Sequence, residues 1–153
     1  RVPFVKQLMQ GVSRRLEDAR SNGSVRSLKG RKCRFDLWEP KGFEMKKALP
    51  KEEALVTYGQ TTQLKRAFTY KALNRLIQAS AADMTKQAMV NLYNQGITPL
   101  LPIHDELDCS VKDIDAARDI ARIMETALEL RVPSKCDIDL GASWGEAKAI
   151  KYV

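Results

Sequence analysis

The chain has 153 residues, 44% of them hydrophobic and 29% charged, with 26 Lys and Arg against 19 Asp and Glu and a net charge of +7. This composition fits one globular domain, or a piece of a larger one, and excludes a disordered tail or a fibre. No stretch approaches the ~18 apolar residues of a membrane span, and no signal-peptide pattern opens the chain. The chain begins with Arg1 instead of Met, which suggests a start inside a longer reading frame.

The charge is divided unevenly along the chain. Residues 1–80 carry 18 basic and 7 acidic side chains, a net charge of +11, whereas residues 81–153 carry 8 basic and 12 acidic side chains, a net charge of −4. A basic half indicates a polyanionic partner, with nucleic acid as the first candidate, and an acidic half indicates a cationic partner. Ordinary surface solvation is the alternative.

The first half predicts a helix, a hairpin and an irregular segment. Pro3 opens a helix that runs to about Ala19, with Val5, Leu8, Met9, Val12 and Leu16 at helical spacing. Residues 24–35 read as a short hairpin that turns at Lys29-Gly30, and they hold five basic residues and no acidic one. Residues 36–65 are expected to be irregular because Pro and Gly interrupt every long pattern, apart from a short helix at 51–56.

The second half predicts an α+β layer with the order helix–strand–strand–helix–strand. Residues 68–94 lack Pro and Gly, and Asn94-Gln95-Gly96 is a good helix end. Two strands follow at 97–103 and 107–111, expected to pair as an antiparallel hairpin around His104-Asp105-Glu106. A second amphipathic helix is expected at 113–130, with its inner face over Ile114, Ala117, Ile120, Ala121, Met124 and Leu128, and a last strand at 135–140.

The acidic hairpin is the sharpest local feature. Asp105 and Glu106 follow the apolar run at 100–103, so burial at the end of that strand would be unfavourable unless a cation compensates the two carboxylates. Mg²⁺ is the natural cation, because it takes hard oxygen ligands, often one or two carboxylates together with substrate phosphates. A solvated turn that happens to be acidic is the alternative.

The preceding helix carries polar side chains on one face. Tyr70, Asn74 and Gln78 stand at i, i+4 and i+8, and small residues follow at 79–82. Amide groups can donate to the minor-groove acceptors that every base pair presents, which would detect duplex geometry without reading sequence. A polar face turned to solvent is the alternative.

The cysteines indicate free thiols. Cys33, Cys109 and Cys136 are widely spaced, no CxxC pair occurs, and His104 is the one histidine, so the ligands for a zinc site are too few. A reducing compartment is expected. A hydrolase with a Cys109–His104 pair is the least favoured alternative, because a five-residue separation on strands points the two side chains to opposite faces.

Several motifs in register resemble one family. The run NRLIQASAADMTKQAM at 74–89 resembles the helix before the catalytic hairpin in family-A DNA polymerases, the bacterial DNA polymerase I type and its phage relatives. The run LPIHDEL at 101–107 is similar to motif C of that family, a His-Asp-Glu turn on the palm. The stretches VPFVK at 2–6, GSV at 23–25, LKGRK at 28–32 and GASW at 141–144 also resemble family positions, and FTYKALN at 68–74 is closer to phage sequences.

The resemblance implies a role for each matching residue. Asp105 would be a ligand of two Mg²⁺ ions, Glu106 a weaker or indirect ligand, and His104 a neighbour of the primer terminus. Asn74 and Gln78 would track the minor groove of primer–template DNA. Many family members have Arg at the position of Tyr70, so one phosphate or base contact of the family would be either missing here or supplied by Lys71. From charge alone, we expect the basic run near the duplex backbone; it consists of Arg26, Lys29, Arg31, Lys32 and Arg34.

The resemblance also implies an incomplete catalytic site. The family's second aspartate and its nucleotide-binding helix lie upstream of what resembles Arg1, so residues 1–67 would be the end of the fingers and 68–153 the palm with its motif C hairpin. We expect a C-terminal part of a DNA-directed DNA polymerase that acts on primer–template DNA and dNTPs in the cytoplasm, is inactive alone, and needs the upstream half in the same or another chain. Self-association is expected if an apolar face is left exposed. A non-catalytic duplex-binding module and a complementing piece of a split polymerase are the alternatives.

Overall fold

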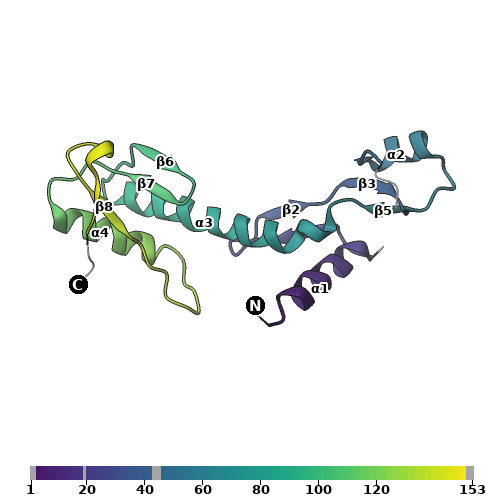
Figure 1. The fold of residues 1–153 in the computed structure, drawn as a ribbon, viewed down its shortest axis with the longest axis horizontal. Coiled ribbons are helices and arrows are strands. Elements are labelled where there is room, and N and C mark those ends of the chain that lie inside the picture. The colour runs from purple at the N-terminus through teal and green to yellow at the C-terminus, as the bar shows by residue number, and fades with distance from the viewer. Residues whose placement is uncertain (1–2, 19, 43–45, 151–153) are drawn as a thin grey trace. The chain divides into compact units, whose positions relative to one another are not determined.

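A computed structural model describes residues 3–18, 20–42 and 46–150, which form two compact units, Arg1–Ser80 and Ala81–Val153 (Figure 1). The mixture of helices and small antiparallel sheets confirms the α+β class. Val2, Ala19 and residues 43–45, on which part of the sequence analysis rests, lie outside the described residues. No helix in the described ranges has the length and apolar character that a bilayer crossing requires.

The first unit opens with the predicted helix and hairpin. Helix α1 (Val5–Glu17) is followed by strands β1 (Ser24–Arg26) and β2 (Lys32–Arg34), which pair antiparallel with Val25 opposite Cys33. Gly30 closes the turn with φ +80°, a conformation that glycine adopts without steric cost. Both the helix and the hairpin are therefore confirmed. The residues that predict each of them lie close together in the chain.

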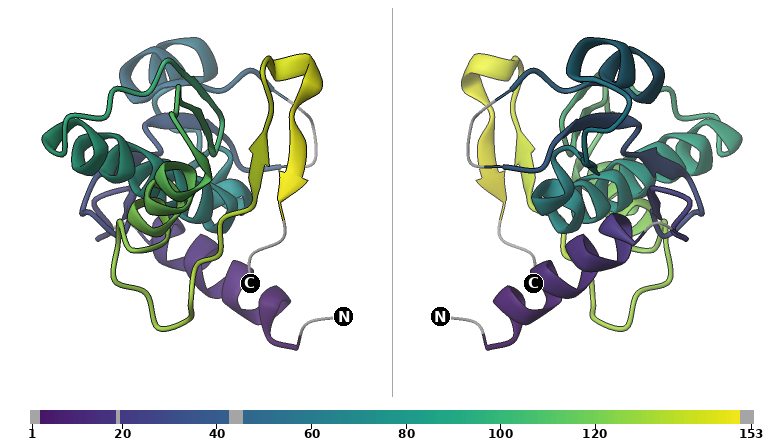
Figure 2. Two further views of the ribbon diagram at one scale, coloured as in Figure 1. Left: turned by 90° about the vertical axis from the view of Figure 1, so that its left-hand side faces the viewer. Right: turned by 90° about the vertical axis from the view of Figure 1, so that its right-hand side faces the viewer.

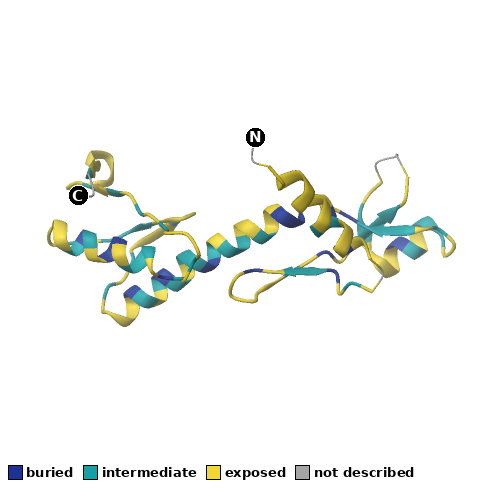
Figure 3. Cartoon of the chain, turned by 90° about the horizontal axis from the view of Figure 1, so that it is seen from below, coloured by how far each residue is buried: buried dark blue, intermediate teal, exposed yellow. Residues whose placement is uncertain are grey.

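The core of the first unit is small. Leu16, Phe35 and Ala72 are buried together, and Val12 and Val25 pack against them. The other apolar residues of the α1 stripe remain largely exposed, with Val5 at 42% and Leu8 at 54% (Figure 3). The helical periodicity thus predicts the helix correctly, while only its C-terminal end is buried within this unit.

The segment expected to be irregular is a sheet. Strands β3 (Leu37–Pro40), β4 (Leu49–Pro50) and β5 (Leu64–Arg66) form a three-stranded antiparallel sheet in the order β4-β3-β5, and helix α2 (Lys51–Tyr58) follows β4. The prediction of irregular structure at 36–65 is wrong, because the pairing partners are distant in sequence, whereas the short helix is confirmed. Pro40 and Pro50 stand at strand ends, where proline is tolerated.

Arg66 connects this sheet to the rest of the first unit. Its guanidinium donates to the carbonyl oxygens of Phe35 and Ser21, both at 3.2 Å, and lies 4.5 Å from the centroid of the Trp38 ring. Gly23, with φ +65°, leaves the space that the guanidinium fills: a Cβ there would lie 2.5 Å from Arg66 Cζ. The Arg66 side chain thus joins the segment before β1, the residue after β2 and strand β3.

The long helix begins later than predicted. A 3₁₀ turn, η1 (Thr69–Lys71), precedes helix α3 (Ala72–Asn94). The buried Thr69 hydroxyl donates to Glu17 at 2.8 Å and accepts from Ser13 at 3.0 Å, which joins η1 to α1. At the other end, the Ile97 N–H donates to the Leu92 carbonyl at 3.0 Å, and Gly96 has φ +78°, so the predicted helix end is confirmed.

The second unit contains two hairpins and a helix. Strands β6 (Leu101–Ile103) and β7 (Glu106–Asp108) form the first hairpin, and helix α4 (Ile114–Glu125) follows. Strand β8 (Ile138–Leu140) pairs antiparallel with β9 (Lys148–Ile150) around a 3₁₀ turn, η2 (Trp144–Glu146), seen in yellow in Figure 2. Strand β9 is not predicted from the sequence. The strands predicted at 97–103, 107–111 and 135–140 are shorter than expected, and Pro99, without an N–H, precedes the first of them.

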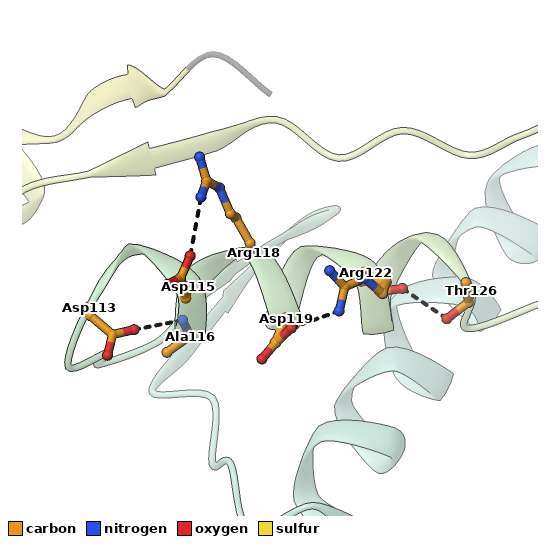
Figure 4. Close-up of polar contacts among 7 residues, drawn as sticks. All are labelled: Asp113, Asp115, Ala116, Arg118, Asp119, Arg122 and Thr126. Atoms are coloured by element: carbon orange, nitrogen blue, oxygen red, sulfur yellow. Dashed lines mark hydrogen bonds and ion pairs between the residues drawn. The ribbon is translucent and has the colours of Figure 1, made fainter. Parts of the chain in front are cut away.

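Helix α4 is well capped and amphipathic. The Asp113 carboxylate accepts from the Ala116 N–H at 2.8 Å, and the pairs Asp115–Arg118 and Asp119–Arg122 lie along the exposed side (Figure 4). The inner face is confirmed for Ala117, Ile120 and Ala121, which are buried, and is wrong for Ile114, the first residue of the helix, which is 37% exposed. The helix ends at Glu125 and not at Leu130: Thr126, with φ −100°, is the C-cap, and the next N–H, that of Ala127, donates to the Met124 carbonyl three residues back at 3.3 Å.

Candidate functional site

The acidic residues stand on a tight hairpin in the second unit. Ile103 pairs with Glu106, so the turn consists of His104 and Asp105 alone, and the Leu100 N–H extends the pairing by donating to the Asp108 carbonyl at 2.8 Å. The expectation that His104, Asp105 and Glu106 all lie between the strands is therefore wrong for Glu106, which begins β7.

The hairpin is more exposed than the sequence analysis supposed. Leu100 is 69% and Leu101 46% exposed, and His104, Asp105 and Glu106 are all exposed. The premise that the carboxylates end a buried strand is wrong, because the leucines of this run face solvent within this unit. Burial therefore does not require a compensating cation here; the carboxylates are instead freely accessible to one.

His104 adopts an uncommon backbone conformation. Its φ is +54°, in the left-handed region that few non-glycine residues occupy, although histidine is enriched among those that do. Such a residue stores of the order of 1 kcal/mol of strain, and strain of this kind is concentrated at functional sites. The conformation belongs to a two-residue turn that places Asp105 at the tip of the hairpin.

A small cavity of about 200 Å³ lies beside Asp105. Its other lining residues come from α3, from the end of α4 and from the segment before β8: Ala81, Met84, Thr85, Ala88, Met124, Glu125, Ser134, Lys135 and Cys136. Glu125 accepts from the Cys136 N–H at 3.0 Å and lies 3.7 Å from Lys135 Nζ, which attaches that segment to α4. Within residues 3–18, 20–42 and 46–150 no group of three or more His, Cys, Asp or Glu side chains is arranged to hold a metal ion.

Two of the cysteines are unsuited to nucleophilic catalysis. Burial, assisted by the charge of Asp108, raises the pKa of the Cys109 thiol above its ordinary value. Burial, followed by the charges of Glu125 and Asp137, raises the pKa of Cys136 in the same way. An activated nucleophile needs a lowered thiol pKa, so these environments argue against the Cys109–His104 hydrolase. The cysteines are free thiols, as expected.

The polar face of α3 lies in the first unit. Asn74 and Gln78 are both exposed, one turn apart on the helix, as the spacing predicted. Tyr70, 62% exposed, belongs to η1 and therefore does not continue the α-helical phase. The Lys71 ammonium lies 5.6 Å from the Tyr70 ring centroid and 5.2 Å from that of Phe68, so the tyrosine, the lysine and Phe68 form one exposed cluster.

The basic residues of the β1–β2 hairpin differ in whether their side chains form hydrogen bonds within the unit. Arg31 donates to the Ala79 carbonyl at 2.8 Å, and the Leu28 N–H donates to the Ser80 hydroxyl at 3.2 Å, so the hairpin tip is fastened to α3. Arg26 donates to the Gly30 carbonyl at 2.8 Å, within the hairpin itself. Lys29 is exposed at the turn.

The other members point to solvent. Lys32 and Arg34 are exposed, and neither side chain forms a hydrogen bond or ion pair with another described residue. Arg75 donates to the Arg34 carbonyl at 3.2 Å and stacks over Phe35, 4.8 Å from the ring centroid. Sequence reasoning missed Arg75, Ser80 and Arg66 as residues that hold this surface in place. No local pattern marks them, since each acts on a carbonyl or an N–H far away in sequence.

The comparisons with known proteins point to nucleic-acid polymerases. The chain is 35% identical over 147 residues to a DNA-directed DNA polymerase of Pseudomonas phage M6, which covers 96% of the chain and 18% of that relative. It is 30% identical over 159 residues to DNA polymerase I of Lactococcus lactis subsp. cremoris, covering 97% of the chain and 15% of the relative. It is 37% identical over 100 residues to the DNA polymerase of Mycobacterium phage D29, covering 61% of the chain and 16% of the relative.

Residues 1–146 match the family described as DNA polymerase family A. The chain therefore belongs to DNA polymerase family A. It spans less than a fifth of the length of each of the three relatives. The family resemblance inferred from the sequence motifs is confirmed, while the assignment of residues 1–67 to the fingers and 68–153 to the palm stays a prediction.

Proposed function

We propose that the chain is part of the catalytic region of a DNA-directed DNA polymerase, which transfers a nucleotidyl group from a dNTP to a primer 3′-hydroxyl under the direction of a template. The family match over residues 1–146 carries this proposal, because it includes both α3 and the β6–β7 hairpin. In this reading, residues 1–67 are the end of the fingers and residues 68–153 the second half of the palm.

Asp105 and Glu106 are the proposed metal ligands. Both are exposed carboxylates at the tip and at the base of a two-residue turn, and hard oxygen donors of this kind suit Mg²⁺ when substrate phosphates complete its coordination. Bound Mg²⁺ would lower the pKa of the attacking hydroxyl and stabilise charge on the transferred phosphate. Asp105 holds the ion, Glu106 assists it as a weaker or indirect ligand, and His104 lies near the primer terminus.

Asn74 and Gln78 are the proposed contacts to duplex DNA. Their exposed amides can donate to purine N3 and pyrimidine O2, acceptors that every base pair presents in the minor groove. This contact detects duplex geometry and does not depend on sequence. The neighbouring Tyr70–Lys71 cluster of η1 supplies a cation just before the start of that helix, and the basic hairpin contacts the phosphate backbone of the bound nucleic acid.

The chain is proposed to be inactive by itself. The described residues offer the pair Asp105–Glu106 and no larger cluster of acidic ligands, whereas clamping two metal ions in working geometry requires another aspartate. The missing group would come from the upstream half of a polymerase, in the same or another chain. The exposed apolar residues of α1, Val5, Leu8 and Met9, would make the chain prone to self-association without that half. The site of action would be the cytoplasm of a bacterium or a phage-infected cell.

A chimaera tests the catalytic role. The chain replaces its matching stretch in the Pseudomonas phage M6 polymerase, and primer extension and duplex binding are measured for the parent chimaera, for Asp105→Ala and for the control Asp139→Ala, an exposed aspartate on β8. We expect Asp105→Ala to lose at least about a hundredfold in extension rate, as for other groups that stabilise transition-state charge, with unchanged DNA binding. The control is expected to keep the parent rate.

The catalytic role and the proposed inactivity of the isolated chain each have a result that would reject them. An unchanged rate in Asp105→Ala would favour a non-catalytic duplex-binding module, in which the acidic turn is structural. Sustained extension by the 153-residue chain alone would show that no upstream half is needed. Recovery of activity on mixing the chain with a separate upstream half would identify it as the complementing piece of a split polymerase.

A further inference from the structure

The β1–β2 hairpin presents its basic residues on one face. Val25 packs against the core of Leu16, Phe35 and Ala72, and its cross-strand partner is Cys33. Because successive side chains of a strand alternate between faces, the neighbours of this pair point away from the core. These outward residues are Arg26, Lys32 and Arg34, and together with Ser24 they form what we call the cationic face.

The amides of α3 point elsewhere. Ala72 is fully buried in the same core. With about 100° of rotation per residue, Asn74 lies roughly 200° and Gln78 roughly 240° around the helix from Ala72. The amides therefore project from the side of α3 opposite the core, and the cationic face projects from the far side of the hairpin. The core of the first unit separates the two surfaces.

The cationic face is built for an anion. Arg26 stands directly opposite Lys32, and like charges in that relation destabilise a hairpin. No acidic residue occurs between residues 24 and 35 to neutralise them. The one aromatic residue of that stretch, Phe35, is buried and contributes to the core, so the face has cations for phosphates and no ring on which a base can stack.

The hairpin is also held firmly in place. Arg31 and the Leu28 N–H fasten its tip to Ala79 and Ser80 of α3, and Ser80 in turn donates to the Leu76 carbonyl at 2.8 Å. The two attachment points stand on the side of α3 that adjoins the core. A cationic face fixed in this way cannot swing around the helix to reach the DNA on the amide side.

We propose that the cationic face binds the backbone of the unpaired template strand that continues beyond the duplex, and not the duplex itself. The inference rests on the proposed function, because it takes the duplex to lie on the Asn74–Gln78 side. A duplex has a persistence length of about 150 base pairs and runs straight past a helix of about 10 Å diameter, whereas a single strand can turn to the other face. The contact is independent of sequence.

Binding measurements on the 153-residue chain test this proposal. The ligands are a blunt duplex, the same duplex with a 5′ template overhang of about ten nucleotides, and the overhang strand alone. The variant is Lys32→Gln/Arg34→Gln, and the charge-matched control is Lys6→Gln/Lys41→Gln, two exposed lysines of the same unit. All four side chains are exposed, so circular dichroism and the urea midpoint should match those of the parent chain.

The salt dependence of affinity is the readout. For single strands the slope of log K against log salt is about −0.7 per phosphate contacted. The hairpin variant should therefore lose about 1.4 from the slope for the overhang ligand and keep the parent slope for the blunt duplex. The control variant should change neither.

Three outcomes would overturn the proposal. An equal loss of slope on the blunt duplex would mean that the cations contact the duplex, and no loss on any ligand would mean that they bind no nucleic acid. A loss in the control as large as in the hairpin variant would indicate unspecific attraction by net charge. Failure of the parent chain to bind the blunt duplex would reject the proposed function alone. Binding of the single strand by the parent chain and its loss in the hairpin variant would then still support the cationic face as a single-strand site.

Discussion

Gly23→Ala is expected to destabilise the first unit through Arg66. Gly23 has φ +65°, and its missing Cβ leaves room for the Arg66 guanidinium, which a methyl group would approach to 2.5 Å at Cζ. The guanidinium is the end of a flexible side chain, so it can move aside. Moving aside, however, costs it the hydrogen bonds to the carbonyls of Phe35 and Ser21.

The magnitude has two parts. A left-handed conformation costs an alanine about 1 to 2 kcal/mol. Each lost hydrogen bond from the part-buried Arg66 adds about 1 kcal/mol, the typical net value for an intramolecular hydrogen bond. Gly23→Ala should therefore lower the free energy of unfolding by about 3 kcal/mol, and Arg66→Met by about 2 kcal/mol. Because both changes remove the same hydrogen bonds, the double variant should cost about 3 kcal/mol, well below the total of the two.

Urea denaturation followed by tryptophan fluorescence measures these values. Trp38 lies under Arg66 and reports on the first unit, so the variants are made in a Trp144→Phe background that removes the signal of the second unit. Trp144 is 70% exposed and tolerates this change. Additive costs in the double variant would refute the steric reasoning, because Gly23→Ala would then lower the free energy of unfolding as much without the Arg66 guanidinium as with it.

Three further predictions concern the second unit. Gly141→Ala should destabilise it by about 2 kcal/mol, because the new Cβ would lie 2.7 Å from the backbone between β8 and β9 and overpacking of this kind costs about 1 to 3 kcal/mol. The control Gly145→Ala should be nearly neutral, since its Cβ would have no neighbour within 4 Å. Equal losses of stability in urea denaturation for the two variants would contradict the clash. Asp113→Ala should cost about 1 kcal/mol by removing the cap of α4, while Asp113→Asn keeps a capping oxygen and the stability. Cys109 and Cys136 should react with iodoacetamide at pH 8 more slowly in the folded chain than in the unfolded chain, by mass-spectrometric mapping, because their raised pKa values suppress the thiolate. Since the folded pKa lies above the unfolded one, these thiols also make stability fall as the pH rises through the alkaline range, and a rise there would contradict the assigned environments.

Local signals in the sequence predicted the helices and the first hairpin. The α1 stripe, the Lys29-Gly30 turn and the Gly96 helix end each depend on residues close together in the chain, and all three are present. The β3–β4–β5 sheet could not be predicted in this way, because Trp38 pairs with Leu49 on one side and Arg66 on the other. Its strands are two to four residues long, too short to produce a period.

The sequence predicted that Asp105 lies on a hairpin turn, but it did not predict how exposed the strand before that turn is. The motif placed Asp105 on a hairpin turn correctly, since the flanking residues favour two strands. The leucines at 100 and 101 suggested burial, and the structure exposes both. Apolar composition alone cannot distinguish a strand that is covered within its own unit from one that is not.

The chain enters and leaves the β3–β4–β5 sheet at one point. The Ala67 N–H donates to the Leu37 carbonyl at 2.8 Å, so the first residue of β3 and the residue after β5 are neighbours. A segment whose two ends meet can be lengthened, shortened or replaced by a simple turn without displacing what precedes or follows it. The sheet can therefore change in length while the basic hairpin and α3 of this chain retain their spacing.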